Sequence, residues 1–386
     1  MSAPSLCVVG AGAIGASVAY HLAASGRKNV LLLDRSDAPG LGSTGAATGG
    51  FRAQFATPVN IRLSLLSRSK LARFREETGV DPGYLPAGYL WVARSDAELA
   101  ALRGALEVQR GEGVSEAREV SPDEVAKLNP WLRREGIVGG TFSPTDGFIR
   151  PRDILEGYLR GAARLGVRIE WRTEVTGSVR GADGSIRSVT TSRGAVEVDA
   201  VVNAAGAWAS SVAALAGVDL PVTPLRRQVA ATVPTDLLPP STPMTIDVGD
   251  GFHFRERDGR ILLLLPTPGV PGKPYDATVD PSWIDRVTEI ARERVPAFRD
   301  VEIDRAASWA GLYEMTPDRH AIVGAAEECR NLYLVNGSSG HGVMHAPALG
   351  QVLAEMISGS KTAVDVSVLR PSRFREGAAI EAPELL

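Results

Sequence analysis

Three glycines and an aspartate near the start of the chain have the spacing of a dinucleotide-binding turn. Gly10, Gly12 and Gly15 lie in GAGAIG, and Asp34 ends the apolar run that follows. Gly10 would permit a tight turn, Gly12 would let a pyrophosphate approach the backbone, and Gly15 would let a helix pack on the preceding strand. Asp34 would accept hydrogen bonds from an adenosine ribose. The pattern predicts dinucleotide binding but does not separate NAD from FAD.

A second candidate site is the segment GSTGAATGGFRAQF, which starts at Gly42. Its residues are small until Phe51 and Arg52, with the hydroxyls of Ser43 and Thr44 as exceptions. An NAD domain would continue with alternating strands and helices instead, so this segment favours FAD. The guanidinium of Arg52 is planar and can bind a carboxylate with two hydrogen bonds. The alternative is an ordinary surface arginine.

Histidines and one tyrosine supply the remaining candidates. His341 and His345 have a spacing that could ligate a metal, but no third ligand follows, so no metal site is predicted. His253 and Tyr313 could line a pocket, although such strand residues are usually part of a core. His21 and His345 are interpreted as packed side chains.

The elements that would position these residues follow from the hydrophobic pattern. Residues 5–9 and 29–33 are apolar runs typical of strands, and a helix pattern lies between them. Two further segments, DAVVNAAGAW and NLYLVNGSSGHGVM, each predict a strand that ends in a loop of small residues. One extended cofactor would need three such junctions, and they fall near residues 10, 205 and 340.

With these elements in place, the chain resembles the FAD-dependent amine and amino-acid oxidoreductases, the family of D-amino-acid oxidase, glycine oxidase, monomeric sarcosine oxidase and the proline and sarcosine dehydrogenase subunits. The motifs that carry the resemblance are GAGAIG, GSTGAATGGFR, RPRDILEGYLRGAARLGV, VVNAAGAW, GLYEMTPDRHAIVG and LYLVNGSSGHG. The resemblance implies an α/β fold. It would consist of an FAD-binding Rossmann-like domain of the glutathione-reductase type and an α+β substrate domain built on an antiparallel sheet.

The resemblance also implies how the chain is divided. The FAD-binding domain would comprise residues 1–75, 145–220 and 310–365, the substrate domain residues 76–144 and 221–309, and a C-terminal tail residues 366–386. Strand patterns and one amphipathic helix between residues 221 and 310 agree with a sheet that carries a helix. Turn signals between residues 173 and 200 predict a small meander.

The cofactor that the resemblance implies is non-covalent FAD. By motif position, its contacts would be Gly10, Gly12, Ala13, Ile14, Gly15, Asp34, Arg35, Gly42, Ser43, Thr44, Thr48, Gly49, Gly50, Val175, Ala205, Gly206, Trp208, Gly311, Gly340, His341, Gly342, Val343 and Met344.

In this family the flavin accepts a hydride at N5 from the carbon next to an amine, and the protein orients the substrate. The candidate residues around that carbon are Arg52, His341, Met344, Tyr313 and His253. Arg52 matches a carboxylate-binding arginine of the sarcosine oxidases. His341 would lie near the flavin ring, where a helix N-terminus stabilises negative charge.

Three differences from monomeric sarcosine oxidase bear on the chemistry. Gly311 stands where those enzymes attach the flavin through a cysteine, so covalent linkage there is excluded. Met344 stands where they have a lysine, which leaves Arg52 as the main carboxylate anchor. No lysine falls in residues 260–265, where they use one to promote the reaction with O2, and Lys273 lies beyond a proline-rich turn. We therefore expect slow oxidation by O2 and favour a dehydrogenase with another electron acceptor.

The predicted reaction is oxidation of the C–N bond of an amino acid or N-alkyl amino acid to an imine, with sarcosine-like or proline-like secondary amines favoured. Alternatives left open are oxidation of a primary amino acid such as glycine or a D-amino acid, oxidation of an alcohol or 2-hydroxy acid, and a flavin-binding subunit or assembly protein with little turnover of its own. The sequence does not decide between a homo-oligomer and a subunit of a hetero-complex.

Composition argues against several other classes. Of the 386 residues, 44% are hydrophobic and 23% charged, as in soluble globular proteins. The formal charge is −3, without a basic run that would suggest nucleic acid. The apolar start lacks a basic leader, so neither a signal peptide nor a membrane span is expected, and the cytoplasm is the expected location. Cys7 and Cys329 lie far apart and imply no disulfide framework.

Overall fold

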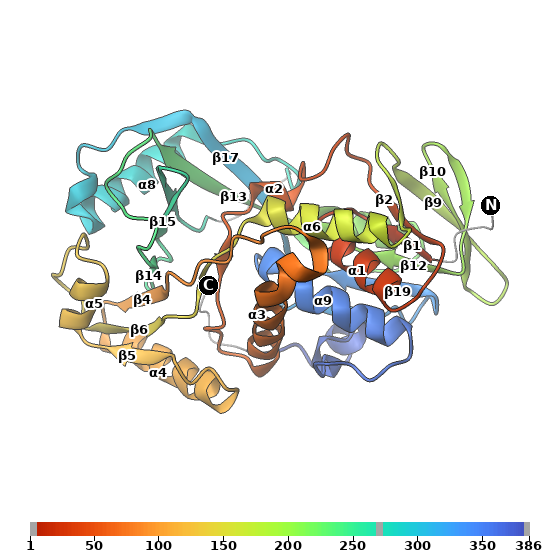
Figure 1. Cartoon of the computed structure of the whole chain (residues 1–386), viewed down its shortest axis with the longest axis horizontal. Coiled ribbons are helices and arrows are strands. Elements are labelled where there is room, and N and C mark those ends of the chain that lie inside the picture. The colour runs from red at the N-terminus through yellow and green to blue at the C-terminus, as the bar shows by residue number, and fades with distance from the viewer. Residues whose placement is uncertain (1–5, 268–272, 382–386) are drawn as a thin grey trace.

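A six-stranded sheet carries the glycine-rich turn in the computed structural model, which describes residues 6–267 and 273–381 (Figure 1). Its order is β18-β19-β12-β1-β2-β8, and every neighbouring pair is parallel except β18 with β19. The strands are β1 (Leu6–Val9), β2 (Val30–Leu33), β8 (Arg168–Glu170), β12 (Ala200–Asn203), β18 (Ile322–Ala325) and β19 (Leu332–Asn336). The turn after β1 therefore lies at the carboxyl edge of parallel strands, where open α/β folds bind ligands.

Helices cover one face of this sheet. They are α1 (Ala13–Ala24), α3 (Pro58–Thr78), α6 (Pro151–Arg164) and α9 (Gly342–Ile357). Helix α1 contacts α6 and α9 as well as the sheet, which explains why its pattern is apolar on nearly all sides (Figure 1). Alternation along β1 sends Leu6 and Val8 into this core, and Cys7 and Val9 into the core on the other face.

The other face packs against a three-stranded antiparallel meander and the short helix α7 (Ala209–Ala214). The meander has the order β11-β10-β9. Its strands are β9 (Val175–Arg180), β10 (Ile186–Thr191) and β11 (Gly194–Glu197). The meander predicted for residues 173–200 is thus confirmed.

The second large sheet has eight strands in the order β17-β13-β16-β15-β14-β4-β6-β5. They are β4 (Tyr89–Ala93), β5 (Arg118–Val120), β6 (Gly139–Ser143), β13 (Thr223–Thr232), β14 (Met244–Asp247), β15 (His253–Arg257), β16 (Arg260–Leu264) and β17 (Ile303–Met315). The expected antiparallel sheet needs one correction, because β14 pairs with β4 in parallel. These two strands are far apart in sequence, so no hairpin forces them to run antiparallel.

One face of the second sheet packs against α5 (Pro122–Leu128) and α8 (Pro281–Arg294). Leu90 and Val92 of β4 point into that core, while Tyr89 and Trp91 lie on the opposite face. Helix α4 (Asp96–Gly111) packs at the edge of the same opposite face.

Shorter elements complete the chain. They are α2 (Ser43–Ala46), the pair of β3 (Gly50–Phe51) with β7 (Gly147–Phe148), and the 3-10 turns η1 (Gly206–Trp208), η2 (Pro296–Phe298), η3 (Ser367–Leu369) and η4 (Pro371–Phe374). Within the two described ranges, no helix combines the length and the apolar character that a membrane crossing requires.

The described part of the predicted C-terminal tail is packed against the rest of the molecule. Arg373 in η4 is 0% exposed, and its Nε and Nη2 donate to the Asp318 carboxylate at 2.8 and 2.9 Å. Nη2 also donates to the backbone oxygen of His320 at 2.9 Å. A buried guanidinium needs such partners, so this ion pair holds η4 against the turn that follows β17.

Candidate active site

A large cavity lies between the two sheets, at the positions singled out in the sequence. Its volume is about 1340 Å³, above the roughly 300 to 1,000 Å³ of common small-molecule pockets. All three strand-to-loop junctions line it, and so do residues from β13, β15 and β17 of the second sheet. The cavity is therefore long enough to hold an extended cofactor with a substrate beside it.

The three glycines of the glycine-rich turn are required for different reasons. Gly10 and Gly15 are required by the fold itself, whereas Gly12 would be required by a bound ligand. Gly10 has φ +104°, and a Cβ there would lie 2.4 Å from the Ala204 oxygen. A Cβ at Gly15 would lie 1.9 Å from the Gly10 oxygen. A Cβ at Gly12 would meet only the Thr44 hydroxyl, at 3.4 Å. The protein without a ligand therefore has room for a side chain at Gly12, but that side chain would project into the cavity. The absence of a side chain at Gly12 suits a pyrophosphate that lies close to the backbone.

One residue that was predicted to contact the cofactor lies outside the cavity. Gly15 is not among the residues that line the cavity, because it faces the backbone of Gly10 inside the turn. It acts on the cofactor site only through helix packing. The other predicted contacts all line the cavity, namely Gly10, Gly12, Ala13, Ile14, Asp34, Arg35, Gly42, Ser43, Thr44, Thr48, Gly49, Gly50, Val175, Ala205, Gly206, Trp208, Gly311, Gly340, His341, Gly342, Val343 and Met344.

Polar side chains stabilise the glycine-rich turn through hydrogen bonds to its backbone amides. Asp34 accepts hydrogen bonds from the amides of Ala11 and Ser36, both at 2.8 Å. Thr44 accepts from the Ala13 amide at 3.0 Å. A carboxylate has more acceptor sites than these two bonds use, so Asp34 can still bind a ribose. Helix α1 has no acidic residue in its first turn, which leaves its positive end available to phosphates.

The small-residue segment is fastened to β17. Ser43 donates to the Leu312 oxygen at 2.6 Å. A Cβ at Gly311 would lie only 2.6 Å from the Cβ of Ala46. A cysteine would not fit at this position without a shift, which agrees with non-covalent binding.

At the end of the cavity near Asp34, aromatic and cationic groups stack. The guanidinium carbon of Arg35 lies 4.0 Å from the centre of the Trp208 ring. Trp208 in turn stacks on Tyr275, with 5.6 Å between ring centres. These planar surfaces suit the adenine end of a dinucleotide.

Arg52 is held inside the opposite end of the cavity. It is 4% exposed, and its guanidinium carbon lies 4.2 Å from the Phe55 ring centre and 5.0 Å from that of Trp91. Nη1 donates to the Gln54 oxygen at 3.0 Å, and Nη2 contacts His341 Nε2 at 3.2 Å. Because arginine only donates, His341 must accept at Nε2 and carry its proton on Nδ1. Burial lowers the pKa of Arg52.

Asp146 supports Arg52 and was missed by the sequence analysis. This carboxyl is 0% exposed and accepts from the amides of Ala53 at 2.9 Å and Gln54 at 3.3 Å. Burial raises the pKa of Asp146 to about 7. Its surroundings in the sequence, SPTDGF, are those of a surface turn, so no local signal predicts a buried role for this carboxyl.

His253 and Tyr313 both line the cavity as proposed. His253 Nδ1 lies 2.8 Å from the Gly251 oxygen and must donate to it, which leaves Nε2 as an acceptor. Burial lowers the pKa of His253 to about 4, so its ring is neutral at pH 7. Burial also raises the pKa of Tyr313. A Cβ at Gly340 would lie 2.4 Å from the Tyr313 ring, so this glycine lets the ring pack on the loop before α9.

His345 and His21 are packed, as expected. His345 is 2% exposed and bonds the Ser64 hydroxyl at 2.9 Å. Burial lowers the pKa of His345 to about 3. His21 Nδ1 bonds the Ser17 oxygen at 2.8 Å within α1. In the part of the chain that the structure describes, no group of three or more metal-binding side chains gathers.

Residues 5–356 match the model of the DAO family, described as FAD dependent oxidoreductase. The chain belongs to this family, and FAD is the cofactor of its oxidoreductase chemistry. The cavity, the glycine-rich turn and the helix N-terminus are the features of the structure that fit this cofactor.

Individual relatives cover most of the chain. It is 31% identical over 396 residues to FAD-dependent oxidoreductase domain-containing protein 1 of Xenopus laevis. This alignment covers 91% of this chain and 78% of that protein. It is 29% identical over 389 residues to mitochondrial dimethylglycine dehydrogenase of Rattus norvegicus, spanning 95% of this chain but 44% of that protein. The solved L-proline dehydrogenase from P. horikoshii has a TM-score of 0.90 and 29% identity, with 97% of this chain and 99% of that chain covered.

Proposed function

We propose that the protein oxidises the C–N bond of an amino acid or N-alkyl amino acid to an imine, which water then hydrolyses. The observation that carries the proposal is the guanidinium of Arg52, fixed between two aromatic rings at the end of the FAD cavity. Similarity to dimethylglycine dehydrogenase and L-proline dehydrogenase supports a secondary or tertiary amine over a primary one.

FAD, when bound, accepts the hydride that leaves the carbon next to the amine. The residues of this chain bind and orient the substrate. Arg52 binds the carboxylate, and the rings of Phe55 and Trp91 exclude water around it. The neutral imidazole of His253 offers Nε2 to the N–H of a secondary amine, but a pKa of about 4 prevents it from retaining a proton at pH 7.

The surroundings favour a neutral amine, which is the form that can lose hydride. Dry walls disfavour the charged ammonium, and a nearby guanidinium repels it. The substrate proton is therefore released before oxidation, and no side chain of the site is required to store it.

The test is an anaerobic panel of amines mixed with the FAD-loaded protein. Bleaching of the flavin absorbance by N-methylated or cyclic amino acids, faster than by glycine or D-alanine, is the expected result. Faster reduction of the flavin by glycine or D-alanine would contradict the proposed preference for secondary or tertiary amines. A flavin that no amine or amino acid reduces would indicate a flavin-binding subunit without turnover of its own.

We also propose that O2 is a poor electron acceptor. Among the described residues that line the cavity, none is a lysine. Lys273 is exposed beyond the end of β16. Stopped-flow mixing of the reduced protein with air-saturated buffer should show slow reoxidation, and an artificial acceptor dye should reoxidise the flavin much faster. Fast reoxidation by air would mean an oxidase.

A further inference from the structure

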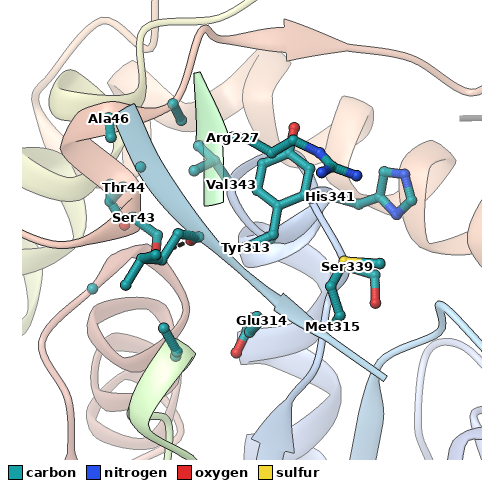
Figure 2. Close-up of a pocket in the computed structure, with 18 of the residues that line it drawn as sticks. Ser43, Thr44, Ala46, Arg227, Tyr313, Glu314, Met315, Ser339, His341 and Val343 are labelled. Atoms are coloured by element: carbon teal, nitrogen blue, oxygen red, sulfur yellow. Dashed lines mark hydrogen bonds between the residues drawn. The ribbon is translucent and has the colours of Figure 1, made fainter. Parts of the chain in front are cut away.

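A second arginine, Arg227, faces the substrate end of the cavity. It lies on β13 opposite Gly311 of β17, and its guanidinium carbon is 5.5 Å from the centre of the Tyr313 ring. Figure 2 shows Arg227 reaching to that ring, with His341 on the same side of the strand that carries Tyr313. No motif marks Arg227 in the sequence, because PLRRQV has the pattern of an ordinary strand.

The hydrogen bonds of Arg227 leave one edge of its guanidinium open. Nη1 donates to the Thr267 oxygen at 2.5 Å and to the Arg226 oxygen at 3.5 Å. Within residues 6–267 and 273–381, Nε and Nη2 meet no acceptor, and no carboxylate oxygen lies within 4.0 Å. This edge has the geometry that binds a carboxylate with two parallel hydrogen bonds.

Other arginines of the chain bind a carboxylate through the same two atoms, Nε and Nη2, with two hydrogen bonds. Arg62 binds Glu112 through Nε and Nη2 at 2.6 and 2.7 Å. Arg103 binds Glu119 in the same way, at 2.8 and 2.6 Å. At Arg227 the same pair of donors points to a partner that the described chain does not supply.

The charges around Arg227 make an anion the expected partner. The groups with an electrostatic effect on it are the Tyr313 phenol and the cationic Arg319. Five acidic residues at the cavity are bonded elsewhere: Asp34 to backbone amides, Glu174 to Arg35, Asp250 to Arg294, Glu314 to the Ser338 amide and Asp318 to Arg373. The sixth, Glu381, is exposed to solvent and forms no ion pair with Arg227. Arg227 is partly buried. Removing a guanidinium from water without a counter-charge is unfavourable, and a bound anion reduces that cost.

Arg52 and Arg227 act on the same two side chains. All four side chains line the same cavity, and Arg227 lies 5.5 Å from the centre of the Tyr313 ring. Each arginine also lowers the pKa of His253, in addition to the larger effect of burial. His253 and Tyr313 therefore share the cavity with both guanidiniums. A ligand that contacts this histidine and this tyrosine can extend toward an arginine at each end.

We propose that Arg227 binds a second anionic group, so that the substrate is a dicarboxylic amine with one carboxylate on Arg52 and the other on Arg227. The amine lies between them, beside His253 and Tyr313. This inference rests on the proposed function for the reaction and for the role of Arg52. It adds the substrate class, because a sarcosine-like or proline-like monocarboxylate would leave Arg227 without a partner.

The test compares two unreactive thioethers of matched shape, thiodiacetate with two carboxylates and (methylthio)acetate with one. Their Kd values are measured on the FAD-loaded protein from the change in flavin absorbance. Thiodiacetate should bind at least tenfold more tightly to the wild type. Equal affinity for the two probes would overturn the proposal, and this comparison needs no variant to fold.

Variants then assign the effect to one side chain. Arg227→Gln should reduce the affinity ratio to within twofold and leave the Kd of (methylthio)acetate unchanged. Arg226→Gln is the matched control: Arg226 precedes Arg227 on β13 but points away from the cavity, toward the Thr278 oxygen at 2.9 Å, and its variant should keep the ratio. If Arg227→Gln weakens both probes equally, Arg227 serves a single shared carboxylate and the proposal is wrong.

The outcomes separate this inference from the proposed function. If no amine reduces the flavin but the thioether ratio depends on Arg227, the anion site stands and the proposed reaction fails. If amines reduce the flavin while both thioethers bind equally well, the reaction stands and the dicarboxylic substrate class fails. In the supported case, iminodiacetate should reduce the flavin with a KM at least tenfold below that of sarcosine.

Discussion

Arg52 illustrates how residue-scale contacts prepare a charged group for one ligand. Its guanidinium has ring contacts with Phe55 and Trp91 and donates to a backbone oxygen and to His341. Asp146 fixes the two amides that follow it. These contacts hold the side chain in one position, so the carboxylate contact that we propose would cost little conformational entropy.

We predict that Arg52→Ala weakens the binding of carboxylate ligands by tens-fold or more. Removing one partner of a buried charge pair costs roughly 2 to 5 kcal/mol. The measurement is the Kd of (methylthio)acetate on the FAD-loaded protein. Arg52→Lys keeps the charge but loses the planar fork, and should give an intermediate Kd. An unchanged Kd in Arg52→Ala would remove Arg52 from the substrate site.

Glu314 supplies a prediction about pH. Its Oε1 accepts from the Ser338 amide at 3.2 Å, and Oε2 has no partner among the described residues. Burial raises the pKa of Glu314 to about 7. The folded state thus holds a proton that the unfolded chain releases near pH 4.5. Stability from this group is complete below pH 4.5, falls as the pH rises to 7, and stays low above it.

We therefore predict that Glu314→Gln stabilises the protein relative to wild type at pH 8 more than at pH 5. Each pKa unit corresponds to about 1.4 kcal/mol, so the effect is on the order of 3 kcal/mol. Urea unfolding with saturating FAD, followed by tryptophan fluorescence, measures it. Asp146, whose raised pKa acts in the same direction, is present in both proteins and cancels in the difference. Parallel pH curves for the two proteins would contradict the buried neutral carboxyl.

At the residue scale, the sequence predicted groups that occur in local motifs and missed those that distant segments bring together. Arg52 and the cavity-lining glycines stand in recognisable motifs. Arg227 and Asp146 do not, because their roles arise from pairing of β13 with β17 and from a contact across 93 positions between Asp146 and Ala53. Gly15 was assigned to the cofactor, although its neighbour is backbone.

At the scale of elements, local sequence patterns were sufficient to predict the structure wherever a strand, a turn and a helix follow each other directly along the chain. The strand-turn-helix at Gly10 and the loops near residues 205 and 340 line one cavity, as one extended cofactor requires. The parallel pairing of β4 with β14 was not predictable from local pattern. Nor was the packing of η4, since it depends on the ion pair of Arg373 with Asp318.

The glycine-rich turn allows fold and cofactor binding to be tested separately. Gly15→Ala places a Cβ 1.9 Å from a backbone oxygen, and we predict a strongly destabilised protein. Gly12→Ala has space within the chain, with its nearest neighbour at 3.4 Å, but fills the cavity wall. It should melt like wild type without FAD and bind FAD at least tenfold more weakly. Wild-type FAD affinity in Gly12→Ala would place the pyrophosphate elsewhere.

At the scale of the whole molecule, one cavity is built from segments spread over nearly the entire chain. FAD bound there should stabilise both sheets together. At a free FAD concentration of 100 times Kd, the gain is about 2.7 kcal/mol. A single thermal transition that rises with FAD concentration is the expected result. Two transitions, of which only one responds to FAD, would show that the sheets unfold independently.

The bound flavin should also leave the unfolded chain completely. Gly311 has no side chain to attach it, and Ala46 occupies the space beside it. After acid precipitation, all yellow colour should remain in the supernatant and the mass of the chain should equal that of its sequence. Colour in the pellet would reveal a covalent bond at another residue.

Beyond an irregularity in its pairing with β13 between Asp304 and Trp309, strand β17 runs regularly from Trp309 to Met315 and meets the loop before α9. It pairs with β13, accepts a hydrogen bond from Ser43 at Leu312, and accepts another from the Ser339 amide at Glu314. Consecutive residues of a strand are about 3.3 Å apart. The offset between the segment at Ser43 and the loop at Ser339 is therefore set by covalent spacing along one strand. A one-residue deletion in β17 would turn Tyr313 to the opposite face, so indels here should be far less tolerated than point substitutions.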